Sequence, residues 1–334
     1  MTKLIVVVGA TGKQGGSVAR TFLGLPGWRV RAVTRNPESN AALSLKDAGA
    51  EVVQADLHND DLTALKAAFD GAHAIFVNTD FWETYRPAAA ALIMAGKDAG
   101  PAGRQAFDYE TACRKHAADV AATIPTLEKF VLSSLTSLVG GSLDPSKFTQ
   151  SFHPESKNWG VDYIEQHVPA LAPKLSVIVP AAYNTNRLVI PKKMGDNMYT
   201  FFSPVHPHIH VPTIDPETGM GPFVRCLVED EPAGTKLLAY DSNQTIAEAV
   251  EVFKRVTGKN ASMVPVSTTQ MVAAGASWEM LRVVDYINEH DMYETGEPGY
   301  IKPSQLTSPP VRPSFEEWAK TFDWDKAIEE NAGR

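Results

Sequence analysis

The sequence contains few cysteines and no long apolar run. Its two cysteines, Cys113 and Cys226, lie far apart and form no CxxC pair, which excludes a disulfide framework or a cysteine-based zinc site. No apolar stretch among the 334 residues approaches the length of a membrane span. The first apolar run stops at Gly9 and is too short for a signal peptide. We therefore expect a cytoplasmic protein with no membrane partner.

A surplus of positive charge is also missing, because 31 Lys and Arg residues stand against 39 Asp and Glu residues, for a net charge of -8. A broad nucleic-acid-binding face needs the opposite balance, so we expect no nucleic-acid partner. A local basic pocket for one phosphate group is compatible with this charge. The length allows one large domain or two modest ones, and the oligomeric state stays open.

Short apolar runs alternate with helical segments along the first half of the chain. Strands are expected at residues 4–8, 29–34, 51–55, 73–78 and 129–133, and helices at residues 15–23, 41–48, 62–69 and 108–122. Because the connections are short, we predict right-handed crossovers and a Rossmann-type doubly wound parallel sheet of the α/β class. Residues 80–107 contain several glycines and prolines and suggest a helix plus a loop insertion.

The second half of the chain has a different texture, with proline and histidine concentrated between residues 191 and 222. We expect strands at residues 175–179 and 235–240. Helices are expected at residues 156–166, at 245–256, at 269–289 with an interruption near Gly275, and at 314–322, which closes the chain. We predict a nucleotide-binding Rossmann domain at residues 1–155, to whose sheet a strand at 175–180 returns. A smaller α/β substrate-binding lobe is formed mainly by residues 181–334.

A glycine-rich loop, Gly9-Ala10-Thr11-Gly12-Lys13-Gln14-Gly15, lies between the first expected strand and helix. Gly9 permits a tight turn, Gly12 lets the backbone approach a pyrophosphate, and Gly15 allows close packing of helix and strand. The helix N-terminus adds N–H groups for an anion. A Walker-type phosphate loop is excluded because Gln14 follows the Gly-Lys step. The loop predicts a dinucleotide cofactor, with a ligand-free glycine turn as the alternative.

An acidic residue is absent from the end of the second strand, where NAD sites usually carry one for the ribose 2′-hydroxyl. The chain instead has Thr34-Arg35-Asn36. The guanidinium of Arg35 can bind a 2′-phosphate through two parallel hydrogen bonds, and Lys13 could reach the same group. The sequence therefore predicts NADP(H) rather than NAD(H), unless Arg35 is simply a solvated residue at the strand end.

These motifs, together with Ala55-Asp56-Leu57, Asn78-Thr79-Asp80-Phe81-Trp82 and Lys129-Phe130-Val131-Leu132-Ser133-Ser134, resemble those of the NmrA-like family. This family contains atypical relatives of the short-chain dehydrogenase/reductases, including the isoflavone-reductase-like enzymes. The resemblance covers most of the chain and is greatest to the fungal branch. Proteins of that branch act as NADP-sensing regulators or as tailoring enzymes of secondary metabolism.

The resemblance implies a role for each matching polar position. Asp56 and the adjoining Leu57 would lie near the adenine, and Asn78 and Thr79 would line the nicotinamide ribose. Ser133 and Ser134 would lie beside the nicotinamide, as expected for ligands bound outside the carboxyl ends of parallel strands. The alternatives are a helix N-cap role for Asp56 and ordinary polar strand ends for the two serines.

The Tyr-x-x-x-Lys pair of ordinary short-chain dehydrogenases corresponds here to His153-Pro154-Glu155-Ser156-Lys157. Lys157 matches the active-site lysine of the family, and a positively charged nicotinamide beside it should lower its pKa. His153 would share a face with Lys157 only if the turn is already helical. Tyr183, which follows the sixth strand, is a rival proton donor. We expect four residues to contact the substrate, namely Phe81, Trp82, Tyr183 and Asn186.

Each of these residues also has a purely structural interpretation. Lys157 could lie on a helix surface, His153 in a polar loop, and Tyr183 in a pocket wall, while Phe81 and Trp82 could belong to the core. The alternating triple His206, His208 and His210 resembles a metal site. Because no acidic ligand lies close in the sequence and Pro207 disturbs the geometry, we expect no metal.

The first hypothesis for function is an NADPH-dependent reductase of a small secondary-metabolite-type molecule, with hydride transfer to C=N, C=O or conjugated C=C. Lys157, His153 or Tyr183 would handle the proton. One alternative is a regulatory protein that senses NADP(H) without turnover. Another is a cyclisation or condensation enzyme that retains the cofactor for structure alone.

Overall fold

The computed structural model describes residues 2–142, 144–290 and 298–332. The chain divides into two compact units, each built from separate stretches. Unit 1 comprises Met1–Val179, Pro216–Leu237 and Gly299–Pro310, and unit 2 comprises Pro180–Asp215, Leu238–Pro298 and Val311–Arg334. Residues 216–237 and 299–310 lie within the range 181–334 that we expected mainly to form the substrate-binding lobe, and they group with the unit that contains the glycine loop.

The centre of unit 1 is a seven-stranded sheet with the order β11-β6-β5-β4-β1-β2-β3. The strand pairs from β6 to β3 are parallel. The predicted Rossmann-type α/β fold is thus confirmed, and apolar residues fill β1, β4, β5 and β6, as expected for strands covered on both faces. The strands are β1 (Lys3–Val8), β2 (Trp28–Thr34), β3 (Glu51–Gln54), β4 (Ala74–Val77), β5 (Lys129–Ser133), β6 (Leu175–Pro180) and β11 (Lys236–Ala239).

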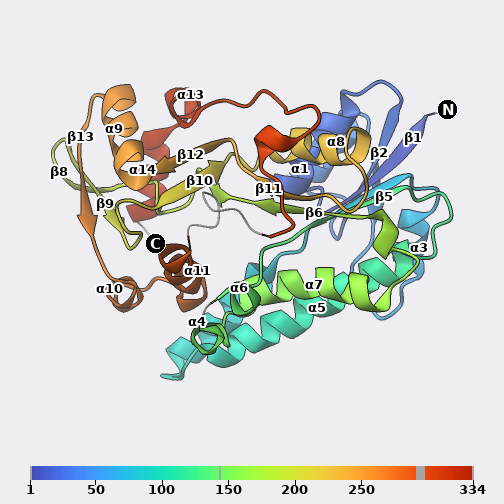
Figure 1. Cartoon of the computed structure of the whole chain (residues 1–334), viewed down its shortest axis with the longest axis horizontal. Helices are drawn as coiled ribbons and strands as arrows, with labels where there is room; N and C mark the ends of the chain where they lie inside the picture. The colour runs from blue at the N-terminus through green and yellow to red at the C-terminus, as the bar shows by residue number, and fades with distance from the viewer. Residues whose placement is uncertain (1, 143, 291–297, 333–334) are drawn as a thin grey trace. The chain divides into compact units, whose positions relative to one another are not determined.

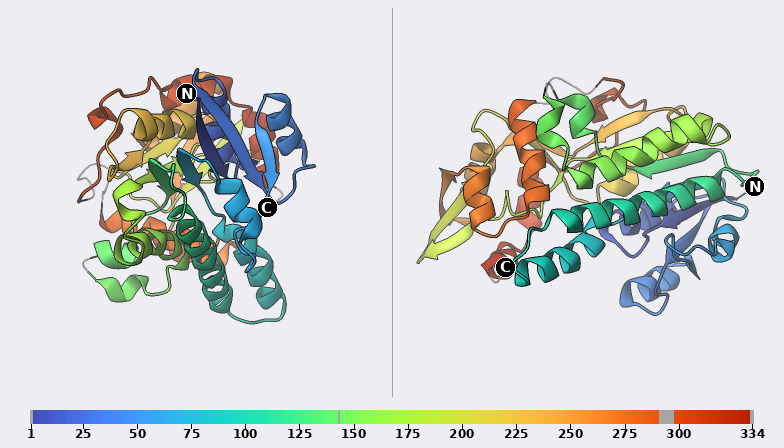
Figure 2. Two further views of the ribbon diagram at one scale, coloured as in Figure 1. Left: turned by 90° about the vertical axis from the view of Figure 1, so that its right-hand side faces the viewer. Right: turned by 90° about the horizontal axis from the view of Figure 1, so that it is seen from below.

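Helices cover both faces of this sheet. On one face α1 (Lys13–Leu23) packs against α8 (Met220–Glu229), and on the other α5 (Gly100–Ala121) and α7 (Phe152–His167) lie side by side, as Figure 1 and Figure 2 show. A Cβ atom at Gly221 would lie 2.1 Å from Thr21 Oγ1, so glycine is what lets α8 approach α1 this closely. The remaining helices of unit 1 are α2 (Asn40–Asp47), α3 (Thr63–Phe69), α4 (Phe81–Met94) and α6 (Leu138–Gly141), with 3-10 turns at Pro145–Phe148, Ala172–Lys174 and Pro303–Gln305.

Two expectations about helices require correction, and one helix was missed. The loop insertion expected within residues 80–107 is mostly helical, because α5 already begins at Gly100 and its Pro101 lies in the first turn, where proline is tolerated. Helix α8 was not anticipated from the sequence. The expectation that residues 314–322 close the chain was wrong, because α14 (Trp324–Ala332) follows α13 (Phe315–Thr321).

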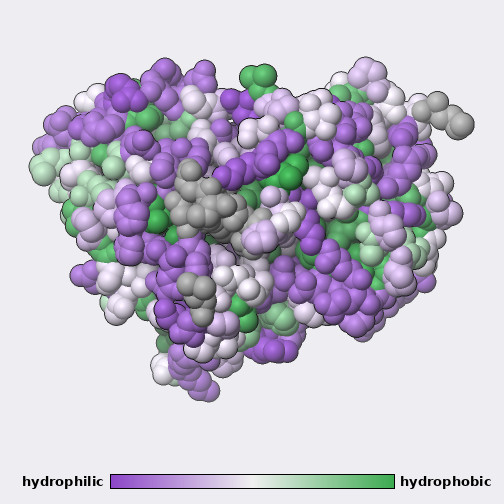
Figure 3. All heavy atoms as spheres, in the orientation of Figure 1, coloured by the Kyte–Doolittle hydropathy of each residue, from purple (hydrophilic) through white to green (hydrophobic). Residues whose placement is uncertain are grey.

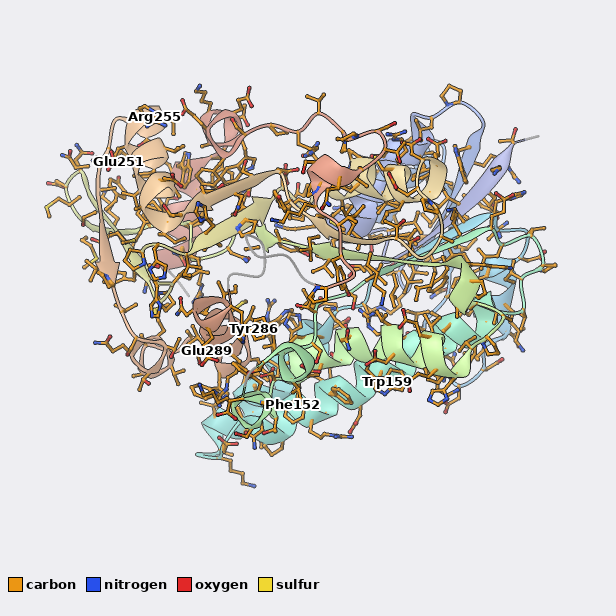
Figure 4. All side chains as sticks on the ribbon, viewed as in Figure 1. Phe152, Trp159, Glu251, Arg255, Tyr286 and Glu289 are labelled. Carbon is orange, nitrogen blue, oxygen red and sulfur yellow. The ribbon has the colours of Figure 1, made fainter. Side chains whose placement is uncertain are left out.

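Unit 2 contains two small sheets and the helices around them. One sheet joins β12 (Ser242–Thr245), β10 (His210–Ile214) and β7 (Ala182–Tyr183), and the other joins β13 (Asn260–Pro265), β9 (Met198–Ser203) and β8 (Lys192–Gly195). Helices α9 (Ile246–Thr257), α10 (Thr268–Ala273), α11 (Trp278–Glu289), α13 and α14 contribute to one core around Phe253 and Trp324. Arg255 and Glu251 both lie on α9 (Figure 4), and Arg255 pairs on the surface with Glu316 at 2.6 Å.

Within residues 2–142, 144–290 and 298–332, no helix is both long enough and apolar enough to cross a membrane. In the space-filling view, hydrophilic side chains are spread over the visible face, with smaller hydrophobic areas between them (Figure 3).

Candidate functional site

The glycine loop forms a compact turn between β1 and α1. Gly9 has a φ of +72°, in the left-handed region, and its carbonyl oxygen accepts a hydrogen bond from Gly12 N at 3.0 Å. A Cβ atom at Gly15 would lie only 2.2 Å from Gly9 O. Gly12 is the N-cap residue of α1 and has no side chain with which to cap the helix. The N–H groups of the first helical turn therefore form a suitable binding place for an anion.

The loop lies where the topology of the sheet changes direction. Strand β1 pairs with β2 on one side and with β4 on the other, and ligands of doubly wound sheets bind in the crevice at such a point. A Cβ atom at Gly9 would lie 3.1 Å from Asn78 O, so the loop backbone directly contacts the end of β4. The predicted residues Thr11, Asn78 and Thr79 are all partly exposed at this edge.

On the β2 side of this point, Arg35 is half-exposed and already has an acidic partner. Its Nη1 donates a hydrogen bond to Glu83 Oε1 of α4 at 2.7 Å, which raises the pKa of Arg35 above its usual value. Lys13, the other predicted phosphate-binding cation, lies 3.6 Å from the carboxylate of Glu217. Each basic group predicted for the 2′-phosphate is therefore paired with a different carboxylate.

The residues predicted near the adenine follow β3. Asp56 is exposed, and its Oδ1 accepts a hydrogen bond from His58 N at 3.0 Å, so it stabilises a local turn rather than capping a helix. Helix α3 starts later, with Leu62 as its N-cap. Leu57 is partly buried, and its carbonyl oxygen lies 2.7 Å from His116 Nδ1. The ring of His58 stacks on that of Tyr109 at 4.1 Å between centroids.

On the β4 side, a buried carboxylate that the sequence analysis missed organises the site. Glu110 of α5 is fully buried and accepts hydrogen bonds from Lys157 Nζ at 2.7 Å, Thr79 Oγ1 at 2.6 Å and Ser156 Oγ at 2.5 Å. Lys157 Nζ also donates to Thr79 O at 2.9 Å. Because 11% of the Lys157 side chain stays exposed, the ammonium group is held at the edge of this buried network.

A second buried cation, Arg114, lies on α5, the helix that also carries Glu110. Arg114 Nη2 is 4.0 Å from Glu110 Oε1 and donates to Ser133 O at 2.9 Å, while its Nη1 donates to Lys157 O at 3.2 Å. Gly160 of α7 makes room for this guanidinium, since a Cβ atom there would lie 2.9 Å from Arg114 Cδ. The cluster thus contains two basic groups and one carboxylate.

The electrostatics favour an ionised Glu110. Burial alone would raise the pKa of Glu110, but the charges of Lys157 and Arg114 and the hydrogen bonds from Lys157 and Ser156 outweigh this effect and lower its pKa to about 2. Burial lowers the pKa of Lys157, whereas the carboxylate of Glu110 opposes that shift. We assign an ammonium–carboxylate pair, because a neutral lysine would leave the charge of Glu110 uncompensated except by Arg114.

The two predicted serines link this network to the glycine loop. Ser133 Oγ donates to Gln14 Oε1 at 2.8 Å, and Ser134 Oγ donates to the carbonyl oxygen of Lys157 at 2.9 Å. Both serines and Gln14 are buried. The end of β5, the start of α1 and the middle of α7 are therefore connected by side-chain hydrogen bonds within unit 1.

His153 lies in the first turn of α7, one helical turn before Lys157. The helix already begins at Phe152 (Figure 4), and Pro154 fits its first turn. The imidazole packs against the rings of Phe81 and Trp82, at 5.2 and 4.8 Å between centroids. Burial and the charge of Lys157 lower the pKa of His153 to about 3, so the ring is neutral at physiological pH.

The remaining predicted residues are distributed over both units. Phe81 is fully buried in a core cluster of α4 and α5, and Trp82 packs against that cluster while partly exposed. Tyr183 and Asn186 belong to unit 2, where Asn186 N donates to Tyr183 O at 2.8 Å. The rings of His206 and His208 lie 5.9 Å apart, and no group of three potential metal ligands occurs among the described residues.

The family model and the curated relatives name the same family. A family model described as the NmrA-like family matches residues 1–319. The NmrA-like family domain-containing oxidoreductase FrzB of Cladobotryum sp is 56% identical over 78 residues, 23% of this chain and 23% of the relative. The similarly described notA' of Aspergillus versicolor is 47% identical over 90 residues, 25% of each. The matches thus span about a quarter of the length of these curated relatives.

Solved structures share the fold at low sequence identity. Nmra, described as a negative transcriptional regulator, has a TM-score of 0.70 at 20% identity, over 99% of this chain and 98% of that one. The same protein has been solved in complex with NAD and with NADP. The leucoanthocyanidin reductase–NADPH complex from Vitis vinifera has a TM-score of 0.66 at 11% identity, over 98% and 99% of the two chains.

Proposed function

We propose that this chain, which belongs to the NmrA-like family, is an NADP(H)-dependent oxidoreductase that acts on a small organic molecule. The names of the fungal relatives and the NADP complexes of the structural neighbours support this proposal. The observation that carries it is the position of the buried Lys157–Glu110 pair, which holds an ammonium group at the same edge of the sheet as the glycine loop.

The glycine loop fits a dinucleotide, because the turn has no room for a Cβ atom at Gly15 and leaves backbone N–H groups at the start of α1. Arg35 and Lys13 would bind the 2′-phosphate. Asp56 and Leu57 would lie near the adenine, and the ends of β4 and β5 would hold the nicotinamide half, through Asn78, Thr79, Ser133 and Ser134. Bound NADPH would supply a hydride to a C=N, C=O or conjugated C=C bond of the substrate.

Lys157 would act as a fixed hydrogen-bond donor. Two of its three N–H donors are used by Glu110 and Thr79 within the described residues, and the third is available to a cofactor or substrate oxygen. A neutral His153 is a poor acid at physiological pH but can still donate or accept one hydrogen bond. Proton delivery to the product would then come through Lys157.

The test is titration of the purified full chain with NADPH and NADH by calorimetry, followed by NADPH oxidation against carbonyl, imine and enone panels. We expect Lys157→Met to reduce turnover by about 100-fold or more while NADPH binding persists. Lys115→Met removes a surface ammonium that pairs with Asp119 and should leave turnover unchanged. If neither nucleotide binds, the cofactor assignment fails, and if binding occurs without oxidation of NADPH, the reductase assignment fails.

A second candidate function is an NADP(H)-sensing regulator without turnover. It is favoured by the histidine at the tyrosine position, because the burial of His153 removes an acid at that point of the site. This candidate predicts that NADPH and NADP⁺ bind with clearly different affinities and that NADPH is not oxidised with any compound of the substrate panels. Turnover with any substrate, abolished in Lys157→Met, excludes it.

A further inference from the structure

We propose that Glu83 is a specificity-determining residue, whose carboxylate competes with the 2′-phosphate of NADP(H) for Arg35 and offers an acceptor to the 2′-hydroxyl of NAD(H). This inference rests on the proposed nucleotide site and deepens it. By sequence, the chain lacks the acidic residue that usually follows the second strand of NAD-binding folds. The fold supplies a carboxylate to that place from a residue 48 positions further along the chain.

The Arg35–Glu83 pair reaches across the point where a dinucleotide would cross the sheet. Arg35 directly follows β2, and Glu83 lies in the first turn of α4, shortly after β4. Strand β1 lies between β2 and β4 in the sheet, and the glycine loop begins at its end. The ion pair, at 2.7 Å between Nη1 and Oε1, therefore joins the two sides of the switch point within unit 1.

The backbone around both side chains is held by other contacts. The carbonyl oxygen of Arg35 accepts a hydrogen bond from Gln54 Nε2 of β3 at 2.9 Å. The start of α4 is capped by Asp80, whose Oδ1 accepts from Trp82 N at 2.9 Å. A ligand can therefore displace the carboxylate of Glu83 from Arg35 by side-chain rotation, without moving β2 or α4.

The charges determine the direction of the effect. A 2′-phosphate carries up to two negative charges and would be repelled by a carboxylate that contacts the same guanidinium. A ribose 2′-hydroxyl carries no charge and can donate a hydrogen bond to that carboxylate. Both side chains are about half-exposed, at 53% and 46%, so solvent screening keeps the effect modest. We expect about a fivefold gain in NADP⁺ affinity when the charge of Glu83 is removed.

The test measures NADP⁺ and NAD⁺ dissociation constants by calorimetry for the wild-type full chain and its Glu83→Gln variant. We expect the ratio of NADP⁺ to NAD⁺ affinity to rise by about tenfold, because NADP⁺ binds more tightly and NAD⁺ about twofold less tightly. In an Arg35→Ala background, Glu83→Gln should strengthen NADP⁺ binding less, because only the repulsion between carboxylate and phosphate is then relieved and no longer the competition for the guanidinium. The matched control is Glu51→Gln, which removes a carboxylate paired with Arg31 at 2.9 Å at the amino end of β3.

The outcomes separate the two proposals. If the wild type binds NADP⁺ but Glu83→Gln leaves the affinity ratio unchanged or weakens NADP⁺ binding, the inference is overturned while the proposed function stands. If the wild type binds neither nucleotide, both are overturned. An equal change in Glu51→Gln would also overturn the inference, because the effect would then follow net charge rather than contact with Arg35. Unchanged unfolding midpoints of both variants show that the comparison is made on folded protein.

Discussion

Replacing Glu110 by glutamine should destabilise the folded chain by about 3 kcal/mol. The pKa of this carboxyl group falls from 4.5 to about 2 on folding, and at about 1.4 kcal/mol for each tenfold change in proton affinity this corresponds to between about 3 and 4 kcal/mol. Removing one partner of a buried ion pair independently costs about 3–5 kcal/mol. The two values agree because Lys157 and Arg114 both lose their buried counter-ion in this variant.

Thermal unfolding of the full chain measures this effect. With an unfolding entropy of about 2.1 cal/mol/K per residue over 334 residues, 3 kcal/mol corresponds to a fall of about 4 °C in the midpoint. The matched control is Asp108→Asn on the same helix, which removes an exposed pair with Arg104 and should change the stability by less than about 0.5 kcal/mol.

A double variant tests the cause of the destabilisation. In Glu110→Gln/Lys157→Met one of the two uncompensated cations is gone, so the double variant should be more stable than the sum of the two single changes predicts. A midpoint for Glu110→Gln within about 1 °C of the wild type, or a loss equal to that of Asp108→Asn, would refute the electrostatic reasoning.

Three further predictions follow from the same geometry. The folded-state pKa of Glu110 lies below its unfolded value, so the stabilisation by its carboxylate is complete above about pH 4.5 and is lost as the pH falls toward 2. Urea unfolding at a series of pH values should therefore show a steeper loss of unfolding free energy with acid in the wild type than in Glu110→Gln, and parallel curves would contradict this. Gly15→Ala should reduce nucleotide affinity by at least about 100-fold, because its Cβ atom would lie 2.2 Å from Gly9 O. The control variant Gly221→Ala should lower the unfolding midpoint and leave the affinity of the folded fraction unchanged, and equal affinity losses by calorimetry would argue against the loop as the binding site. Because burial lowers the pKa of His153 to about 3, the pH profile of turnover between about pH 5 and 8 should keep its shape in His153→Asn, and the loss of a titration limb there would show that the imidazole is charged.

The sequence was sufficient for those parts of the fold that depend on local patterns. Buried strands of a parallel sheet are continuous apolar runs, and β1, β4, β5 and β6 were expected within one or two residues of their observed ends. The glycine loop could be recognised because each of its three glycines answers a separate steric requirement. Helix α5 was expected too short, since Gly100 and Pro101 suggest a break although both are compatible with a helix start.

The acidic residues of the site could not be predicted in the same way, because their partners are distant in sequence. Glu110 and Lys157 are 47 positions apart, and Arg35 and Glu83 are 48 apart, so only the fold brings these pairs together. One local signal for Glu110 was present, since Glu110 and Arg114 are spaced i, i+4 on the side of α5 that also carries Ala106, Cys113 and Ala117. A charged pair on an otherwise apolar helix face indicates a buried role.

The discontinuity of unit 1 affects how the chain can be synthesised and dissected. Helix α8, which packs against α1, and strand β11, at the edge of the sheet, come from residues that emerge from the ribosome long after the glycine loop. Until then α1 lacks this covering helix and β6 lacks its outer neighbour, so the nascent first part of unit 1 exposes apolar surface and an open strand edge to chaperones. A gene fragment that stops at residue 179 would carry every glycine of the loop and still encode an incomplete domain. Reporter fusions or split-protein designs should therefore cut the chain within a surface loop of one unit rather than at this apparent boundary.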